Sequence, residues 1–242
     1  MPVSEGHLEA LFSFLFYIGW KDDAKQSTEE FILLGEISQQ YIIPDALNYT
    51  INNLGYRSYD FEKAQKLYYA CKFGVPDWGE SAMKDILRAY AGVEKTVGDI
   101  HLHSNIMTIL YAGQSNIRYY IRLLANNIPD LDSNPVWAHC PQKSRCEKSL
   151  QKGWQTAIKP DLSLINHGGI QQVYFHIRRV LKGDPTFDLT PHPAFKGMTD
   201  KCCEVFLHQV EEVVNRIDKF IVDEAGARVK KWIQTDSAAV HN

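Results

Sequence analysis

The sequence predicts an all-α fold. Apolar residues recur at helical spacing along most of the 242 residues, and segments with the alternating pattern of strands are hard to find. Capping residues precede many of these periodic runs, and glycine or proline follows them. With 45% hydrophobic and 23% charged residues, the chain has the composition of a globular protein, not of a disordered or fibrous one.

The expected helices follow from these signals in chain order. Ser27 and Asp60 precede apolar runs as caps, Pro44 opens a run, and Gly74 ends one. Asp77 is expected to cap the helix that follows Pro76. The expected helices cover residues 31–41, 44–54, 61–73, 78–97, 106–126, 170–181 and 199–220, with a further turn or two over 228–233.

Residues 127–161 differ in character from the helical runs. They contain four prolines and a series of basic residues, Lys143, Arg145, Lys148, Lys152 and Lys159. Prolines at this density favour turns and irregular structure, so we expect a connecting segment here.

The apolar segment 8–20 is the most hydrophobic part of the chain. It falls short of the roughly 18 apolar residues that a membrane span needs. No Lys or Arg precedes it, so a secretory signal is not expected. The segment must bury itself either in its own core or in a groove on another protomer. Both remain open from composition alone.

Charge is unevenly distributed. Residues 83–182 carry 13 basic and 7 acidic side chains, although the whole chain has a net charge of -3. Such a basic region either binds a polyanion or forms a solvated, salt-bridged surface. Helical spacing places some of its cations on common faces, with tyrosines beside them. The candidate RNA-binding residues are Lys84, Arg88, Lys95, Arg118, Tyr119, Arg122, Arg178, Arg179 and Lys182.

Two groups of residues suggest metal sites. Asp99, His101 and His103 resemble the DxHxH start of the polymerase-and-histidinol-phosphatase hydrolases; the alternative is two histidines at a helix boundary. His139, Cys140 and Cys146 are a partial zinc site or ordinary free thiols, because the usual CxxC spacing is absent. No GxSxG, P-loop or dinucleotide-binding glycine pattern is present. The sequence therefore predicts no enzyme activity, no metal and no cofactor.

Two short motifs carry a family resemblance. In residues 70–86, a helix ends at Gly74 and a Lys-bearing helix begins after the Asp77-Trp78 turn. Residues 192–200 read His-Pro-Ala-Phe-Lys-Gly-Met-Thr-Asp, and the motif residues are Gly74, Asp77, Trp78, His192, Pro193, Phe195 and Gly197. Both motifs resemble segments of phlebovirus-like (phenuivirid) nucleoproteins, in the same order.

The resemblance implies a two-lobed helical protein with a basic cleft that holds single-stranded genomic RNA without sequence specificity. It divides the chain into an N-terminal arm and connector over 1–30, an N-lobe over 31–128 and a C-lobe over 129–242. The arm would dock in a groove of the next protomer and form homo-oligomers. The candidate oligomerisation residues are Leu11, Phe12, Leu15, Phe16, Ile18 and Trp20.

The resemblance also implies a place in the virion ribonucleoprotein and the host cytoplasm, with the viral polymerase as a further partner. Two other functions remain open. One is a helical protein-interaction or accessory factor that uses the aromatic N-terminal helix. The other is a metal-dependent hydrolase centred on Asp99, His101 and His103.

Overall fold

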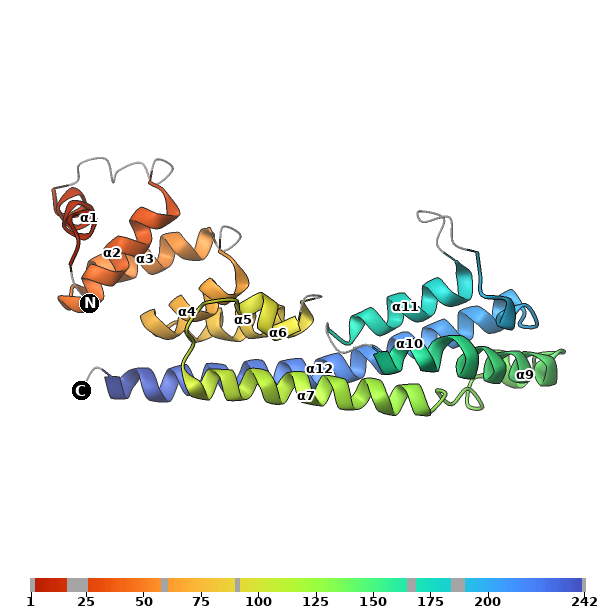
Figure 1. Ribbon diagram of the computed structural model, residues 1–242. Helices are drawn as coiled ribbons and strands as arrows, with labels where there is room; N and C mark the ends of the chain where they lie inside the picture. Colours follow the sequence, from red (N-terminus) through yellow and green to blue (C-terminus); the bar gives the residue numbers. More distant parts are fainter. Residues whose placement is uncertain are drawn as a thin grey trace. The chain divides into compact units, whose positions relative to one another are not determined.

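A computed structural model describes residues 3–16, 26–57, 61–89, 92–164, 169–183 and 190–240 (Figure 1). Within these ranges all regular structure is helical and no strand occurs, which confirms the all-α class. Contacts divide the chain into a first unit, residues 1–82 with 230–242, and a second unit, residues 83–229. These bounds differ from the arm and lobes expected from the sequence.

The first unit consists mainly of short helices. It contains α1 (Glu5–Leu15), α2 (Thr28–Gln40), α3 (Pro44–Tyr56), α4 (Lys63–Phe73), the start of α5 (Pro76–Arg88) and the end of α12 (Asp200–Val240). Phe31, Leu34 and Ile37 of α2 are fully buried at the centre of its core. Gly35 permits this packing, because a Cβ there would lie 2.9 Å from both the Phe73 ring and Thr50.

Local signals place several helix ends where the sequence predicts them. The Ser27 hydroxyl accepts a hydrogen bond from the Glu30 N–H, and the Glu30 carboxylate accepts one from the Ser27 N–H. Gly74 ends α4 with φ of 66°, a conformation that favours glycine. The prediction for Asp77 was wrong: α5 begins at Pro76, so Asp77 lies in its first turn and does not cap it.

The second unit is built around Trp154. It contains the end of α5, α6 (Gly92–Val97), α7 (Ser104–Asn126), α8 (Pro135–Ala138), α9 (Lys143–Gly153), a π-helical turn η1 (Trp154–Ile158), α10 (Lys159–Leu164), α11 (Gln171–Lys182), a 3-10 turn η3 (Pro193–Phe195) and most of α12. The Trp154 indole N–H donates to the Ala125 carbonyl at 3.0 Å. Its ring meets that of Phe206 edge-on, with 5.9 Å between centroids. Trp154 thereby joins α7 and α12.

The expected connecting segment is instead largely helical. From α9 to α10, Cys146, Leu150, Trp154, Ile158 and Leu162 are all buried. Their constant spacing of four residues puts them on one face of a continuous helical run. The π-helical turn ends at Ile158, two residues before Pro160, which has no N–H to donate, and the helical run continues through the proline. The prolines therefore do not prevent helix formation here.

The expected helix over 78–97 is interrupted. It ends at Arg88 as α5, and α6 begins at Gly92. The segment at Gly169 approaches closely, because a Cβ on Gly169 would lie 2.9 Å from the Arg88 backbone. At the other end of the chain, α12 reaches Val240 and extends well beyond the expected limit of residue 220.

Candidate functional site

The two basic residues of α5 are bound to acidic residues of α12. The Arg88 guanidinium donates two hydrogen bonds, of 3.0 and 2.7 Å, to one carboxylate oxygen of the buried Asp218. This bonding raises the pKa of Arg88, and burial opposes the rise. Lys84 Nζ lies 3.0 Å from an oxygen of Asp223. Lys84 and Arg88 therefore hold α5 against α12.

Other predicted RNA-binding residues lie on α7. Tyr119 is exposed and packs edge-on against Tyr120, with ring centroids 5.4 Å apart. Arg122 is exposed, whereas Arg118 is half-buried. The buried Nε of Arg118 has no hydrogen-bond partner among the described residues.

The remaining predicted residues lie on α11 and α6. On α11, Arg178 and Arg179 are exposed, and Lys182 pairs with Glu204 at 3.8 Å. Lys95 lies on α6, so Lys84, Arg88 and Lys95 do not share one continuous helix. The predicted set thus comes from four helices, and Lys84, Arg88 and Lys95 do not form the one stripe that their spacing on a single regular helix would give.

A concave basic surface at the start of α9 was missed as a site. It encloses about 630 Å³ and is lined by Pro141, Gln142, Lys143, Ser144, Arg145, Lys148 and Ser149. Three of these residues are cations, two carry hydroxyl groups and none is acidic. Lys143 pairs with Asp132 at 3.2 Å, and this contact raises the pKa of Lys143. No ion pair within the described ranges involves Arg145 or Lys148. We call these seven residues the α9 surface.

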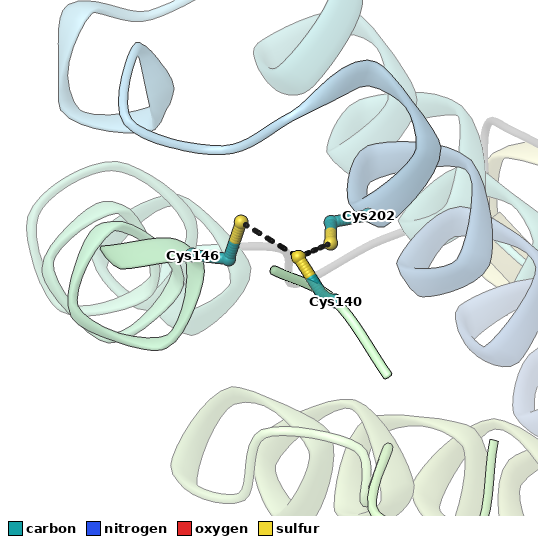
Figure 2. Close-up of side chains that lie close together, drawn as sticks. All are labelled: Cys140, Cys146 and Cys202. Carbon is teal, nitrogen blue, oxygen red and sulfur yellow. Dashed lines mark hydrogen bonds between the residues drawn. The ribbon is translucent and has the colours of Figure 1, made fainter. Parts of the chain in front are cut away.

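Three cysteines converge beside the α9 surface (Figure 2). Cys140 lies in the turn after α8, Cys146 is on α9, and Cys202 is on the first turn of α12. The Cys140 sulfur is 3.8 Å from that of Cys146 and 3.2 Å from that of Cys202. All three sulfur atoms lie within 4.8 Å of one another, and Cys146 and Cys202 are buried. We call these three residues the cysteine cluster.

The thiols of Cys140 and Cys202 differ in pKa. Hydrogen bonds from Cys202 and from the backbone N–H of Gln142 lower the pKa of Cys140. Burial raises the pKa of Cys202 to about 12, because the charged thiolate loses its hydration there. Cys140 is therefore the thiol of the pair that ionises more readily.

The second sequence motif connects α9 to α12. The Phe195 ring fills the space beside Gly153, where a Cβ would lie only 2.3 Å away. Gly197 lies against Ser149 in the same way. The Thr199 hydroxyl then accepts a hydrogen bond from the Cys202 N–H at 3.3 Å. This motif therefore brings Cys202 to the two cysteines near the start of α9.

The histidines of the two groups that suggested metal sites do not meet other metal-ligating side chains within the described residues. His103 caps α7, with its Nδ1 accepting from the Asn105 N–H at 3.2 Å. Asp99 and His101 are exposed, and no strand holds them within the described ranges. His139 is exposed and lies 2.8 Å from the Pro135 carbonyl. Among described residues, only the cysteine cluster groups three side chains of metal-ligating type. The DxHxH arrangement is therefore not formed.

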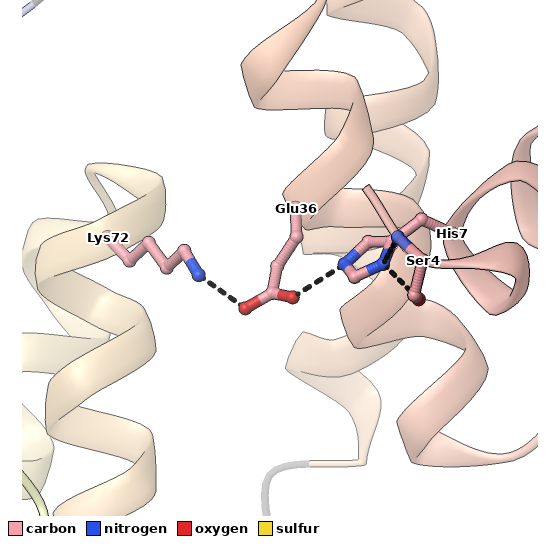
Figure 3. A network of polar contacts seen from close by, with 4 residues as sticks. All are labelled: Ser4, His7, Glu36 and Lys72. Atoms are coloured by element: carbon pink, nitrogen blue, oxygen red, sulfur yellow. Dashed lines mark hydrogen bonds and ion pairs between the residues drawn. The ribbon is translucent and has the colours of Figure 1, made fainter. Parts of the chain in front are cut away.

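The N-terminal helix α1 packs against α2 of its own chain. His7 is buried, with its Nε2 3.1 Å from a Glu36 oxygen and its Nδ1 2.6 Å from the Ser4 hydroxyl (Figure 3). Lys72 of α4 contacts the other Glu36 oxygen. The network thus links α1, α2 and α4.

The predicted oligomerisation residues divide into two groups on α1. Leu11 is buried, whereas Phe12, Leu15 and Phe16 are 52%, 48% and 69% exposed. Ile18 and Trp20 lie outside the described residues. Helix α1 therefore has one apolar face on its own core and a second apolar face, with Leu8, that nothing described covers.

Comparisons with known proteins give no family. No family model, curated protein or solved structure matches the chain. Within the described residues, no helix is both long enough and apolar enough to span a bilayer.

Proposed function

We propose that this protein is a viral nucleoprotein that binds and encapsidates single-stranded RNA without sequence specificity. The observation that carries the proposal is the α9 surface, a concavity with three cations, two hydroxyl groups and no carboxylate. Phosphates are the anions that such a surface suits, since Lys and Arg neutralise their charge and hydroxyl groups donate to their oxygens. The motif resemblance points to the same class of protein.

The proposal assigns the main phosphate contacts to exposed basic residues that form no ion pair within the described part of the chain. Arg145 and Lys148 on α9 take this role, together with the exposed Arg122, Arg178 and Arg179. Tyr119 offers an exposed ring on which a base can stack. Lys84 and Arg88 serve instead to join α5 to α12. All of these cations belong to the second unit, so the basic cleft of the proposal lies within that unit.

Oligomerisation through α1 is the second part of the proposal. The exposed face with Phe12, Leu15 and Phe16 is suited to a groove of the next protomer, since a monomer leaves it in water. Head-to-tail docking of this kind forms rings or filaments along an RNA strand. The assembly would act in the virion ribonucleoprotein and the host cytoplasm, with the viral polymerase as a partner and without enzyme activity.

RNA binding can be tested directly on the full chain. Untreated purified protein is expected to carry nucleic acid, seen as a high ratio of absorbance at 260 to 280 nm, and to elute as multimers. After removal of the nucleic acid, binding of a fluorescent poly-uridine oligonucleotide is measured by anisotropy at several salt concentrations. The double variant Arg145→Glu with Lys148→Glu should weaken binding and reduce the salt slope by about 1.4, or about 0.7 for each lost contact.

A matched double variant controls for net charge. Lys63 and Lys231 are exposed and lie in the first unit. Lys63→Glu with Lys231→Glu changes the net charge equally and should leave the slope unchanged. RNA-free protein that binds no oligonucleotide at low salt would overturn the proposal. Equal losses in both double variants would overturn the assignment to the α9 surface.

A helical protein-interaction factor is the second candidate, favoured by the exposed Phe12 and Phe16 rings, which stack 6.4 Å apart. It predicts protein free of RNA whose α1 face binds another protein in a groove. The absorbance ratio separates the two candidates before any variant is made.

A further inference from the structure

We propose that Cys140, Cys146 and Cys202 bind a zinc ion that joins the start of α9 to the start of α12. The proposal concerns metal binding by these thiols and does not depend on RNA binding. It rests on the convergence and spacing of the three sulfur atoms, on the burial of Cys146 and Cys202, and on the hydrogen bonds among the thiols (Figure 2).

The spacing of the sulfur atoms suits a tetrahedral zinc site. A Zn–S bond is about 2.3 Å long, so two thiolates on one tetrahedral ion lie about 3.8 Å apart. The Cys140 and Cys146 sulfur atoms are separated by 3.8 Å, and no pair in the cluster exceeds 4.8 Å. The 3.2 Å between Cys140 and Cys202 needs to open by about half an ångström to match the same geometry.

The cluster is assembled by tertiary structure from distant parts of the chain. Cys202 is 62 residues from Cys140, and the Phe195–Gly153 and Gly197–Ser149 contacts bring its helix to α9. Soft thiolate ligands select zinc among the common divalent ions, whereas hard ions such as Mg²⁺ and Ca²⁺ take oxygen ligands. The donor set therefore points to zinc.

Hydrogen bonds hold two of the sulfur atoms in place. The Cys202 N–H donates to the Thr199 hydroxyl at 3.3 Å, and the Cys202 thiol donates to the Cys140 sulfur at 3.2 Å. Outer hydrogen bonds of this kind orient the ligands of a metal ion. When Zn²⁺ binds, each thiol gives its proton to solvent and each sulfur donates an electron pair to the ion. Water or another ligand completes the fourth position.

A bound zinc ion would fix the geometry of the α9 surface. Gln142 lines that surface and also contacts Cys140, while Arg145 directly precedes Cys146. A metal link to α12 removes freedom from the turn that holds these residues, because three separate segments become ligands of one ion. The ion is therefore structural in this proposal.

Metal analysis of full-length protein is the first test. Protein produced with added zinc, purified and passed through a desalting column, is expected to hold about one zinc ion per chain. Each of three serine variants should hold at least about tenfold less zinc per chain than the wild type: Cys140→Ser, Cys146→Ser and Cys202→Ser. Cys71→Ser should hold as much zinc as the wild type. Cys71 is a matched control because it is a free, half-buried cysteine of the first unit.

A measurement on the wild-type chain covers the case in which the serine variants fail to fold. Reduced, metal-free protein is titrated with Co²⁺, and the bands of a tetrahedral cobalt thiolate are expected to appear and then to vanish when Zn²⁺ is added. Zinc should also slow alkylation of the three cluster cysteines, read by peptide mass spectrometry, and leave Cys71 labelling unchanged.

Three results would overturn the zinc site. The first is wild-type protein that takes up neither Zn²⁺ nor Co²⁺. The second is equal zinc in Cys71→Ser and all three cluster variants. The third is an intact mass that shows a Cys140–Cys202 disulfide in freshly purified, unreduced protein. RNA binding is measured separately by anisotropy, so its loss leaves these results unaffected.

Discussion

Arg88 neutralises Asp218 by donating two hydrogen bonds to one oxygen of this buried carboxylate. The other Asp218 oxygen is buried and has no hydrogen-bond partner among described residues. The guanidinium is thus the main compensation for a charge that has lost its hydration. Arg88 was a candidate RNA-binding residue by its spacing, but its guanidinium is bound to Asp218 and holds α5 against α12.

Arg88→Ala is expected to lower the free energy of unfolding by about 1–3 kcal/mol, because it leaves the Asp218 charge buried and unpaired. This range is below that of a fully buried pair, because the Arg88 side chain is 43% exposed. Urea unfolding followed by circular dichroism measures the effect.

Lys84→Ala serves as the control for this prediction. Its partner Asp223 is 44% exposed, so the loss should stay below about 1 kcal/mol. An Arg88→Ala variant as stable as Lys84→Ala would contradict the role given to the Arg88–Asp218 pair.

Gly153→Ala is expected to destabilise the second unit by about 1–3 kcal/mol, because the new methyl group would meet the Phe195 ring at 2.3 Å. The companion change Phe195→Leu should recover part of the loss. Thermal unfolding of both variants gives the comparison.

Gly55→Ala is the matched control, since it is also a helical glycine. A Cβ there meets the Trp78 ring at an ordinary 3.7 Å. It should leave stability unchanged or raise it, because alanine favours the helix over glycine by about 1 kcal/mol. Equal losses at Gly55 and Gly153 would count against the close contact with Phe195.

His176 makes the stability of the second unit dependent on pH. Burial lowers its pKa below the ordinary 6.5; Asp161, 3.2 Å away, opposes this shift, and Arg179 reinforces it. As pH falls below about 6.5, the unfolded chain takes up this proton before the folded chain does. The free energy of unfolding should therefore decrease between pH 6.5 and the lower folded pKa.

The contribution of His176 can be isolated with His176→Gln, which cannot titrate in this range. Urea unfolding at about pH 7.5 and about pH 5.5 should show a smaller loss in the variant than in the wild type. The same loss in both proteins would assign the dependence to other groups.

Local chemistry made some helix ends predictable, whereas long-range packing did not follow from the sequence. The Ser27 cap and the Gly74 terminus depend on contacts within a few residues, and both were predicted correctly. Arg88 and Asp218 are 130 residues apart, so residue spacing could not pair them. Whether a basic side chain forms an ion pair with a distant acidic residue can be seen only in the folded structure.

The same distinction applies to the cysteine cluster and the α9 surface. Cys140 and Cys146 suggested part of a zinc site, but nothing local indicated Cys202 as the third member. The helical run that carries the α9 surface was predictable in principle, because apolar residues recur every four positions from Cys146 to Leu162. The four prolines in residues 127–161 favoured a connecting segment, although the helical run continues through Pro160 after a π-helical turn.

Substitutions on the two apolar faces of helix α1 should affect different properties, because one face is exposed and the other is buried. Changes on the exposed face should affect self-association, and changes on the buried face should affect stability. Phe12→Ser with Phe16→Ser removes only exposed rings and should leave the thermal unfolding temperature nearly unchanged. The same variant should reduce multimers of RNA-free protein in light scattering, because that face is the proposed contact with the next protomer.

Leu11→Ser is the opposite case, because Leu11 is 8% exposed and packs in the core of the first unit. It should cost about 2–4 kcal/mol of unfolding free energy, since a buried aliphatic side chain is replaced by a hydroxyl group. If the double Phe variant kept the wild-type multimers, the exposed face of α1 would have no part in assembly. The Ser4–His7–Glu36 network would then serve only to hold α1 on its own chain.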